Sequence, residues 1–250
     1  VVVAGLRRAH HIGRVGAFGE QVIAAGFVSV HFVNVTDHSP SVAPFGGADG
    51  RYVTNPICVA VPGTETTPPI VLDMATSKIA AGKVRVALNK GEALSPDTVI
   101  DASGRPSTDP SVLYTSPRGA LLPIGEHKGS GLALICEILA GALTGGGTIQ
   151  DRNARKDGII NNMLSLVIDP GRLVDTEWLG TEIDALIAFV KDSPPAAEGT
   201  PVMVAGDPER AARIARDRDG IVIDDTTWSG IVDAVGSLGL TGDEIKSASS

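Results

Sequence analysis

Apolar and β-branched residues gather in short runs along the first half of the chain, and segments rich in glycine and proline separate these runs. The runs predict β-strands at 1–5, 27–34, 55–61 and 70–73. Small and apolar residues recur at helical spacing over 15–25, which predicts a helix between the first two strands. A second helix is predicted over 76–88, whereas 99–110 has the composition of turns throughout.

Predicted helices and strands also follow one another in the second half of the chain. Residues 128–143 are small and apolar on all sides, which predicts a helix buried all round. A strand at 162–168 precedes an amphipathic helix that ends at Pro194 and Pro195. Asp207 before Pro208 predicts a helix that ends at Gly220, followed by a strand at 221–223 and a weaker helix at 228–238. Because helices and strands interleave without the regular spacing of parallel crossover units, we expect an α/β chain with a mixed sheet.

Charge and cysteine content narrow the classes of partner. The 250-residue chain has a formal net charge of −8, and its lysines and arginines are scattered. We therefore expect no nucleic-acid or acidic-membrane partner, because such binding needs a clustered basic surface. Cys58 and Cys136 lie in apolar runs, where a buried and reduced thiol is usual, so a cytoplasmic location is expected. No run approaches the roughly 20 apolar residues that span a bilayer.

Several common site motifs are missing from the sequence. Gly13, Gly16 and Gly19 are spaced three apart, which differs from the Gly-x-Gly-x-x-Gly fingerprint of Rossmann domains. The five histidines include no pair at i, i+4 beside a glutamate, so we expect no metal site.

Two adjacent histidines, His10 and His11, stand between a predicted strand and a glycine-led turn, close to Arg14. An imidazole can donate a proton to a carbonyl oxygen near neutral pH and accept it in the reverse reaction. This makes His11 a candidate acid or base. The alternative is that one of the two histidines only hydrogen-bonds its own turn.

Lys128 and Gly129 stand where the apolar helix is predicted to begin. A helix N-terminus offers free N–H groups and a partial positive charge, and small residues let an anion approach closely. The segment could therefore bind a phosphate or carboxylate group, or be only a helix cap with a solvated lysine.

Asp73 ends an apolar run, where it could accept hydrogen bonds from ribose or cap the next helix. Thr54 and Asn55 could serve a ligand or stabilise a local turn.

Several multi-residue segments appear in an order typical of one family. They are RRAHHIGRVG (7–16), VAPFGG (42–47), VTNP (53–56), PPIVLDMATSK (68–78), STDP (107–110), GALLPIGEHKGSGLAL (119–134) and LAGALTGG (139–146). Taken together they resemble the type-2 malate/L-lactate dehydrogenases, and among these the hydroxycarboxylate dehydrogenases in particular.

The resemblance implies a mixed-sheet, non-Rossmann nicotinamide-binding domain over 31–169. Residues 1–30 and 170–250 would then form part of a second domain, which binds substrate and forms a homodimer. Members of the family carry a longer segment ahead of the match, with a Ser-His-Gly motif whose histidine is named as proton donor. That segment is absent from this sequence, so His11 would be half of the acid/base apparatus.

The resemblance also implies roles for individual residues. His11 matches the histidine of the family's His-x-Gly motif, which is assigned as the acid/base in some members. The implied cofactor contacts are Asp73, Met74 and Ala75 (Asp-Met-Ala), Lys128 and Gly129 (Lys-Gly), Gly206 and Asp207 (near Pro-Gly-Glu), and His38 or Ser39. We expect Arg14, Thr54 and Asn55 to contact the substrate.

The expected activity is hydride transfer between NAD or NADP and a small 2-oxo or 2-hydroxy carboxylic acid. One alternative is an imine reductase that acts on a cyclic amino acid precursor. The other is a dinucleotide-binding module without turnover.

Overall fold

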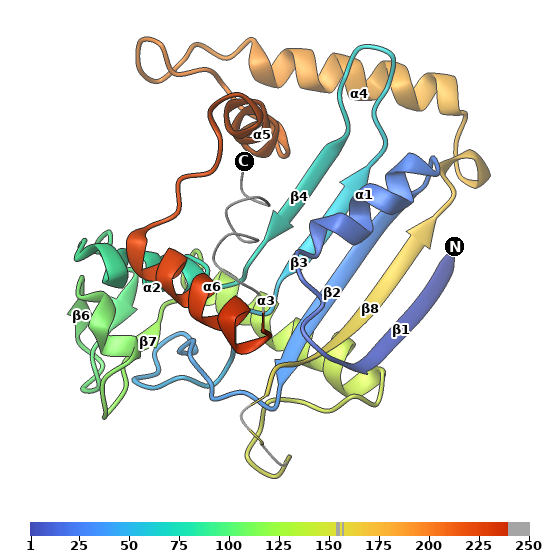
Figure 1. Ribbon diagram of the computed structural model, residues 1–250. Coiled ribbons are helices and arrows are strands. Elements are labelled where there is room, and N and C mark those ends of the chain that lie inside the picture. The colour runs from blue at the N-terminus through green and yellow to red at the C-terminus, as the bar shows by residue number, and fades with distance from the viewer. Residues whose placement is uncertain (154–155, 157, 240–250) are drawn as a thin grey trace.

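A five-stranded sheet forms the centre of the computed structural model, which describes residues 1–153, 156 and 158–239. Its strands lie in the order β1-β8-β2-β3-β4 (Figure 1). They are β1 (Val2–Ala9), β2 (Val28–Thr36), β3 (Ile57–Val61), β4 (Ile70–Met74) and β8 (Ile160–Ile168). Every neighbouring pair is antiparallel. The α/β composition is confirmed, but the sheet is antiparallel rather than mixed, because its neighbouring strands run in opposite directions.

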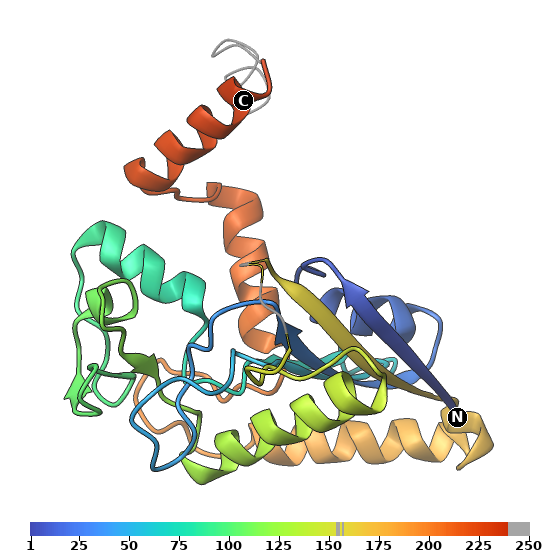
Figure 2. The same cartoon turned by 90° about the horizontal axis from the view of Figure 1, so that it is seen from below.

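Helices cover both faces of this sheet (Figure 2). On one face, α1 (Gly16–Ala24) packs on β2, β3 and β4. A Cβ atom at Gly19 would lie 2.9 Å from that of Ala60, so only glycine allows this close approach. On the other face lie α3 (His127–Cys136) and the π-helical η2 (Glu137–Leu143). Successive residues of β2 show the alternation, since Val33 packs in the cluster beneath α1 and Asn34 bonds Glu137 of η2.

The helix predicted to be buried all round is instead buried on one side. Leu134 and Ile138 are 47% and 46% exposed, and Leu143 is 66% exposed. The prediction was wrong because apolar composition alone does not show how many faces of a helix meet a neighbour. The outer side of α3 and η2 is an apolar surface of this chain.

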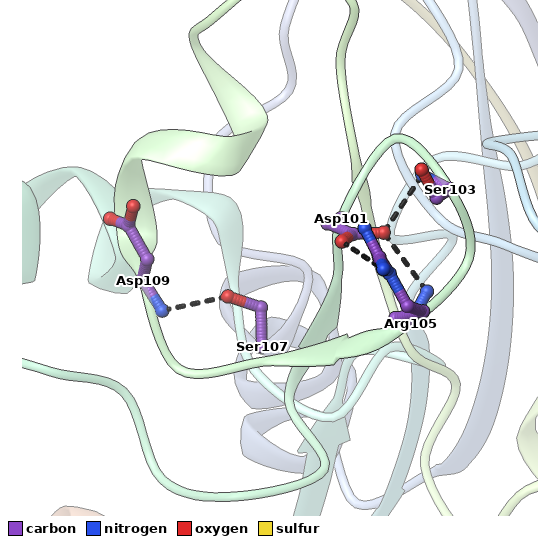
Figure 3. Close-up of polar contacts among 5 residues, drawn as sticks. All are labelled: Asp101, Ser103, Arg105, Ser107 and Asp109. Atoms are coloured by element: carbon purple, nitrogen blue, oxygen red, sulfur yellow. Dashed lines mark hydrogen bonds and ion pairs between the residues drawn. The ribbon is translucent and has the colours of Figure 1, made fainter.

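A smaller three-stranded sheet lies beside the main one, in the order β6-β5-β7. This lobe contains α2 (Ala81–Lys90), β5 (Val99–Ile100), β6 (Pro106–Ser107), η1 (Pro110–Leu113) and β7 (Ala120–Leu121). Residues 99–110 are thus a short hairpin and not turns alone. The hairpin loop is held by Asp101, whose Oδ1 accepts the backbone N–H groups of Ser103 at 2.8 Å and Arg105 at 3.0 Å (Figure 3).

The C-terminal helices form the remaining part, with the short turn η3 (Pro170–Arg172) ahead of them. They are α4 (Thr176–Lys191), α5 (Asp207–Asp219) and α6 (Asp225–Ser237). The predicted stop at Gly220 is confirmed, but the strand at 221–223 is wrong. Val222 is 93% exposed, and this apolar run joins α5 to α6 as an extended link. Figure 2 shows α6 projecting from the rest of the chain.

The main sheet contains residues from both predicted domains. β1 pairs with β8, so the predicted boundary at residue 30 falls inside one sheet, and the division into domains stays a prediction. Within the described residues, no helix combines the length and apolarity needed to cross a membrane.

Candidate active site

Four of the predicted site segments lie at the same end of the main sheet. His11 follows β1, residues 38–39 follow β2, residues 54–55 precede β3, and residues 73–75 form the end of β4. Because neighbouring strands are antiparallel, β1, β2 and β4 finish and β3 begins at the same end of the sheet. In Figure 1 this is the lower end of the sheet. Segments distant in the sequence are therefore brought together.

Asp73 is engaged with the start of α1. Its Oδ2 accepts the backbone N–H of Gly16 at 2.8 Å, and Arg14 Nη1 lies 3.8 Å from the same oxygen. A Cβ atom at residue 16 would lie 2.6 Å from this carboxylate, which explains the glycine. Asp73 thus caps a helix, as one of the alternatives proposed, but the helix precedes it in the chain by more than 50 residues. This bond ties the loop after β1 to the end of β4.

A cavity of about 580 Å³ opens beside Asp73 and is lined by the predicted residues Arg14, Asp73 and Gly206. Its lining contains five cations (Arg14, Lys83, Arg210, Arg213 and Arg216) and four carboxylates (Glu20, Asp73, Glu209 and Asp217). Arg14 is paired with Glu20 at 2.6 Å. Three further cations of the wall have no carboxylate within ion-pair distance in the described part of the chain: Lys83, Arg213 and Arg216. These three residues, called the cationic wall below, give the cavity unpaired positive charge in a chain of net charge −8, which favours an anion.

Lys128 and Gly129 begin α3 directly beside the end of β4. The Gly129 N–H bonds the carbonyl of Ile124 at 2.8 Å, and the Ile124 N–H bonds the carbonyl of Thr76 at 2.9 Å. A Cβ atom at residue 129 would lie 2.2 Å from the first carbonyl oxygen and 2.8 Å from the second. The Asp-Met-Ala and Lys-Gly segments are therefore adjacent through the backbone, with the side chain of Lys128 exposed.

His11 is exposed, and its ring bonds within its own turn. Nδ1 accepts the backbone N–H of Gly13 at 3.1 Å, so the neutral ring carries its proton on Nε2. This is the local bond foreseen as the alternative, yet it leaves Nε2 able to donate to a ligand. The neighbouring Ile12 N–H bonds Asn161 Oδ1 at 2.9 Å, which anchors the loop to β8.

The other predicted cofactor contacts lie in different settings. Asp207 bonds Lys191 at 2.8 Å and Arg210 at 2.5 Å, and it accepts the Val204 N–H at 3.0 Å. Burial opposes the charged form, but these bonds lower the pKa of Asp207 to about 2. Its carboxylate thus joins α4 to α5, whereas Gly206 lines the cavity. His38 and Ser39 are half-buried and do not line that cavity.

Thr54 and Asn55 support the site from within. The Thr54 carbonyl accepts the N–H of Thr76 at 2.9 Å and its hydroxyl at 3.1 Å. Asn55 is fully buried, and its Nδ2 bonds Glu137 Oε1 at 2.8 Å. Asn55 therefore lies behind the site surface rather than on it. Among buried side-chain atoms of the described residues, Asn55 Oδ1 alone lacks a hydrogen-bond partner.

Sequence reasoning assigned no role to Glu137. It is 4% exposed, and burial raises the pKa of its carboxyl group even though Asn34, Asn55 and Ile149 donate hydrogen bonds to it. The sequence feature that could have identified Glu137 is that it is a single acidic residue in an apolar helix. A carboxyl group is buried in such a helix only where hydrogen-bond donors surround it. No cluster of three or more potential metal ligands occurs in the residues that the structure describes.

Comparisons with known proteins agree on one family. The family model for malate/L-lactate dehydrogenase matches residues 1–232. An L-lactate dehydrogenase of Cupriavidus necator is 42% identical over 226 residues, which cover 90% of this chain and 64% of the relative. Hydroxycarboxylate dehydrogenase B of Escherichia coli is 42% identical over 242 residues, covering 96% and 66%.

A solved structure gives the same result for the fold. The E. coli structure, described as a malate/lactate dehydrogenase, superposes with a TM-score of 0.90 at 41% identity, covering 98% of this chain and 68% of that one. The chain thus spans slightly less than two thirds of the length of the two curated relatives. By the extent of the family match and by these identities, the chain belongs to the malate/L-lactate dehydrogenase family.

Proposed function

We propose that the protein transfers hydride between NAD or NADP and a small 2-oxo or 2-hydroxy carboxylic acid, through a dinucleotide site that is not of the Rossmann type. The observation that carries the proposal is the adjacency of the end of β4 to the start of α3. Of these segments, Asp73 also lines a cavity that contains five cations, whereas residues 74–75 and 128–129 do not line it. The antiparallel sheet supports the second part, because Rossmann domains are built on a mostly parallel sheet.

The residues present fit a dinucleotide. Lys83, Arg213 and Arg216 offer charge to phosphates. Gly16 and Gly129 let protein segments pack closely, Asp73 against the start of α1 and the backbone at Thr76 against α3. Asp73 to Ala75, Lys128, Gly129 and Gly206 would hold the cofactor, with His38 or Ser39 as a further contact. When bound, the nicotinamide supplies or accepts the hydride.

The chain's own residues would orient the substrate and move the proton. His11 Nε2 would donate a proton to the substrate's carbonyl oxygen during reduction and take it back during oxidation. Arg14 would bind the substrate carboxylate, and its bond to Glu20 keeps the guanidinium in place. Thr54 supports the corner at Thr76 through its carbonyl.

We also propose that the protein is a homodimer, in which residues 1–30 and 170–250 contribute to the second domain. The described outer side of α3 and η2 is apolar and exposed. The chain exposes 14952 Å², whereas a compact monomer of this mass would expose about 10,400 Å². A second copy would cover part of the excess. The two free, buried cysteines support a location in the cytoplasm.

A direct experiment mixes the protein with NADH or NADPH and a panel of 2-oxo acids and cyclic imines, and follows the absorbance of the reduced nicotinamide. Oxidation of the cofactor with a 2-oxo acid is the expected result. Turnover of cyclic imines alone would favour the imine reductase instead. Cofactor binding without oxidation would indicate a binding module.

A further inference from the structure

A chain of buried polar side chains lies between the main sheet and η2. Glu137 accepts hydrogen bonds on both carboxylate oxygens, from Asn55 Nδ2 at 2.8 Å on Oε1, and from Asn34 Nδ2 at 3.0 Å and the Ile149 N–H at 2.9 Å on Oε2. Asn34 Oδ1 in turn accepts Asn162 Nδ2 at 2.9 Å. All four side chains named here are at most 4% exposed. Polar groups at this depth are costly unless their hydrogen bonds are made, so the arrangement is fixed in geometry.

One end of this chain reaches the loop that carries His11. Asn162 Oδ1 accepts the backbone N–H of Arg8 at 2.8 Å, and Asn161, which bonds the Asn34 carbonyl at 3.3 Å, accepts the N–H of Ile12 at 2.9 Å. The regular pairing of β1 with β8 is interrupted in the same segment, between Leu6 and Ala9. The asparagines therefore hold the backbone on both sides of His11 where the ladder is irregular.

The other end reaches the corner proposed to bind the dinucleotide. Asn55 follows Thr54, whose carbonyl accepts two hydrogen bonds from Thr76. Thr76 in turn meets the backbone that leads into Gly129. Glu137 joins the two ends, because its Oε1 accepts a hydrogen bond from Asn55 at one end and its Oε2 accepts one from Asn34, which leads to the other end.

We propose that Glu137 is a positioning residue, which holds the His11 loop and the corner at Thr54 to Thr76 in one fixed frame. This inference rests on the proposed function for its catalytic meaning. A carboxylate is needed because all three groups that face it are N–H donors. The amide oxygen of a glutamine could accept the donors on one side. Its NH2 group would face an N–H donor on the other side, so one hydrogen bond would be lost.

The test compares Glu137→Gln with the full-length wild-type chain. We expect kcat to fall about tenfold, dinucleotide Kd to change less than about threefold, and amide hydrogen exchange in residues 8–13 to rise about tenfold, as for one unmatched buried donor. Leu94→Ala is the control for lost stability, since Leu94 belongs to the core of the small lobe. It should destabilise the protein without raising exchange in residues 8–13.

A second variant tests whether the pairing of donor and acceptor between residues 55 and 137 is what matters. Adding Asn55→Asp to Glu137→Gln gives the glutamine N–H a carboxylate acceptor, so exchange and kcat should recover in part. Recovery should be incomplete, because the bond from Asn55 Nδ2 to the Ala133 carbonyl at 3.3 Å is lost. If Glu137→Gln fails to fold, Asn55→Ala, which removes the donor to Glu137 Oε1 at the other end of the chain of side chains, should raise exchange in residues 8–13. Unchanged exchange there in the folded variant, or equal losses of kcat and dinucleotide affinity, would overturn the proposal.

The exchange measurement also separates this inference from the proposed function. A wild-type protein that oxidises no reduced cofactor with any 2-oxo acid would remove the proposed activity. Raised exchange in residues 8–13 of Glu137→Gln would still support the positioning role of Glu137. Unchanged exchange would refute that role even if the wild-type protein is an active enzyme.

Discussion

Two cavities of similar size lie at different ends of the main sheet, and their chemistry differs. The larger, about 660 Å³, lies between the hairpin of β3 and β4 and helix α4. Its charged residues are all acidic: Glu65, Glu177 and Asp184. The smaller, about 580 Å³, is lined by five cations and by four carboxylates, Asp73 among them. Volume alone would favour the first as a binding site. The presence of cations, three of them without a carboxylate partner among the described residues, favours the second for an anionic dinucleotide.

The largest expected effect concerns proton transfer by His11, which does not line the smaller cavity. His11→Asn should lower kcat roughly 100- to 10,000-fold, the range typical of a lost general acid or base, because asparagine cannot exchange a proton. Dinucleotide Kd, measured by fluorescence titration, should stay within about threefold, since the ring is assigned to the substrate. Equal losses of turnover and of cofactor affinity would count against the role of His11.

The next effect concerns the close approach of α3 to β4. Gly129→Ala should cost on the order of 1–3 kcal/mol of unfolding free energy, because its Cβ would overlap two carbonyl oxygens. Dinucleotide affinity should fall with it. Chemical denaturation and cofactor titration measure both.

Gly131→Ala in the same helix is the matched control for this change. A Cβ at residue 131 meets nothing within 4 Å, so the variant should gain about 0.5–1 kcal/mol from helix propensity. Similar behaviour of the two variants would show that the tight contact at residue 129 is unimportant.

A smaller effect tests the cationic wall. Arg213→Glu should weaken dinucleotide binding about fivefold to twentyfold at low salt, since each exposed charge contributes about 1 kcal/mol at close range. The effect should shrink as salt is added. Arg218→Glu, on the same helix but outside the cavity lining and paired with Asp219, should leave the Kd unchanged. Equal effects of both variants would indicate a general influence of net charge.

The smallest effect belongs to the larger cavity. Asp184 accepts hydroxyl hydrogen bonds from Thr64 and Thr67, and these bonds lower the pKa of its carboxyl group. A lowered folded-state pKa stabilises the protein above the unfolded pKa, and this contribution is lost as pH falls through the folded value. Asp184→Asn should therefore melt lower than wild type near neutral pH, and the difference should vanish in acid. Its kcat should not change, and a large loss would move the active site to this end.

The sequence predicted strand and helix positions well where one pattern dominates. The β-branched run of β2 and the end of α5 at Gly220 were confirmed, because local residues decide both. The predicted N-cap at Asp207 was wrong by one residue, since Gly206 caps α5 and Asp207 is its first residue. The apolar run at 221–223 was mistaken for a strand, since a strand also needs a partner that this run lacks in the described structure. The antiparallel order of the sheet depends on long-range pairing that no local pattern contains.

The sequence singled out Asp73 and Gly129 because each belongs to a multi-residue motif, and their roles stay predictions. The bond from Gly16 to Asp73 could not be predicted, because it joins segments that are distant in the sequence. The position of Glu137 behind Asn55 could not be predicted, because it depends on which side of α3 and η2 meets the sheet.

The central claim is that the start of α3 and the end of β4 together hold a dinucleotide. A crystal structure of the full chain with NADH or NADPH tests it most directly. The account predicts nicotinamide density in contact with residues 73–75 and Gly129. Density in the cavity beside α4, with the corner at residues 73–75 empty, would contradict it.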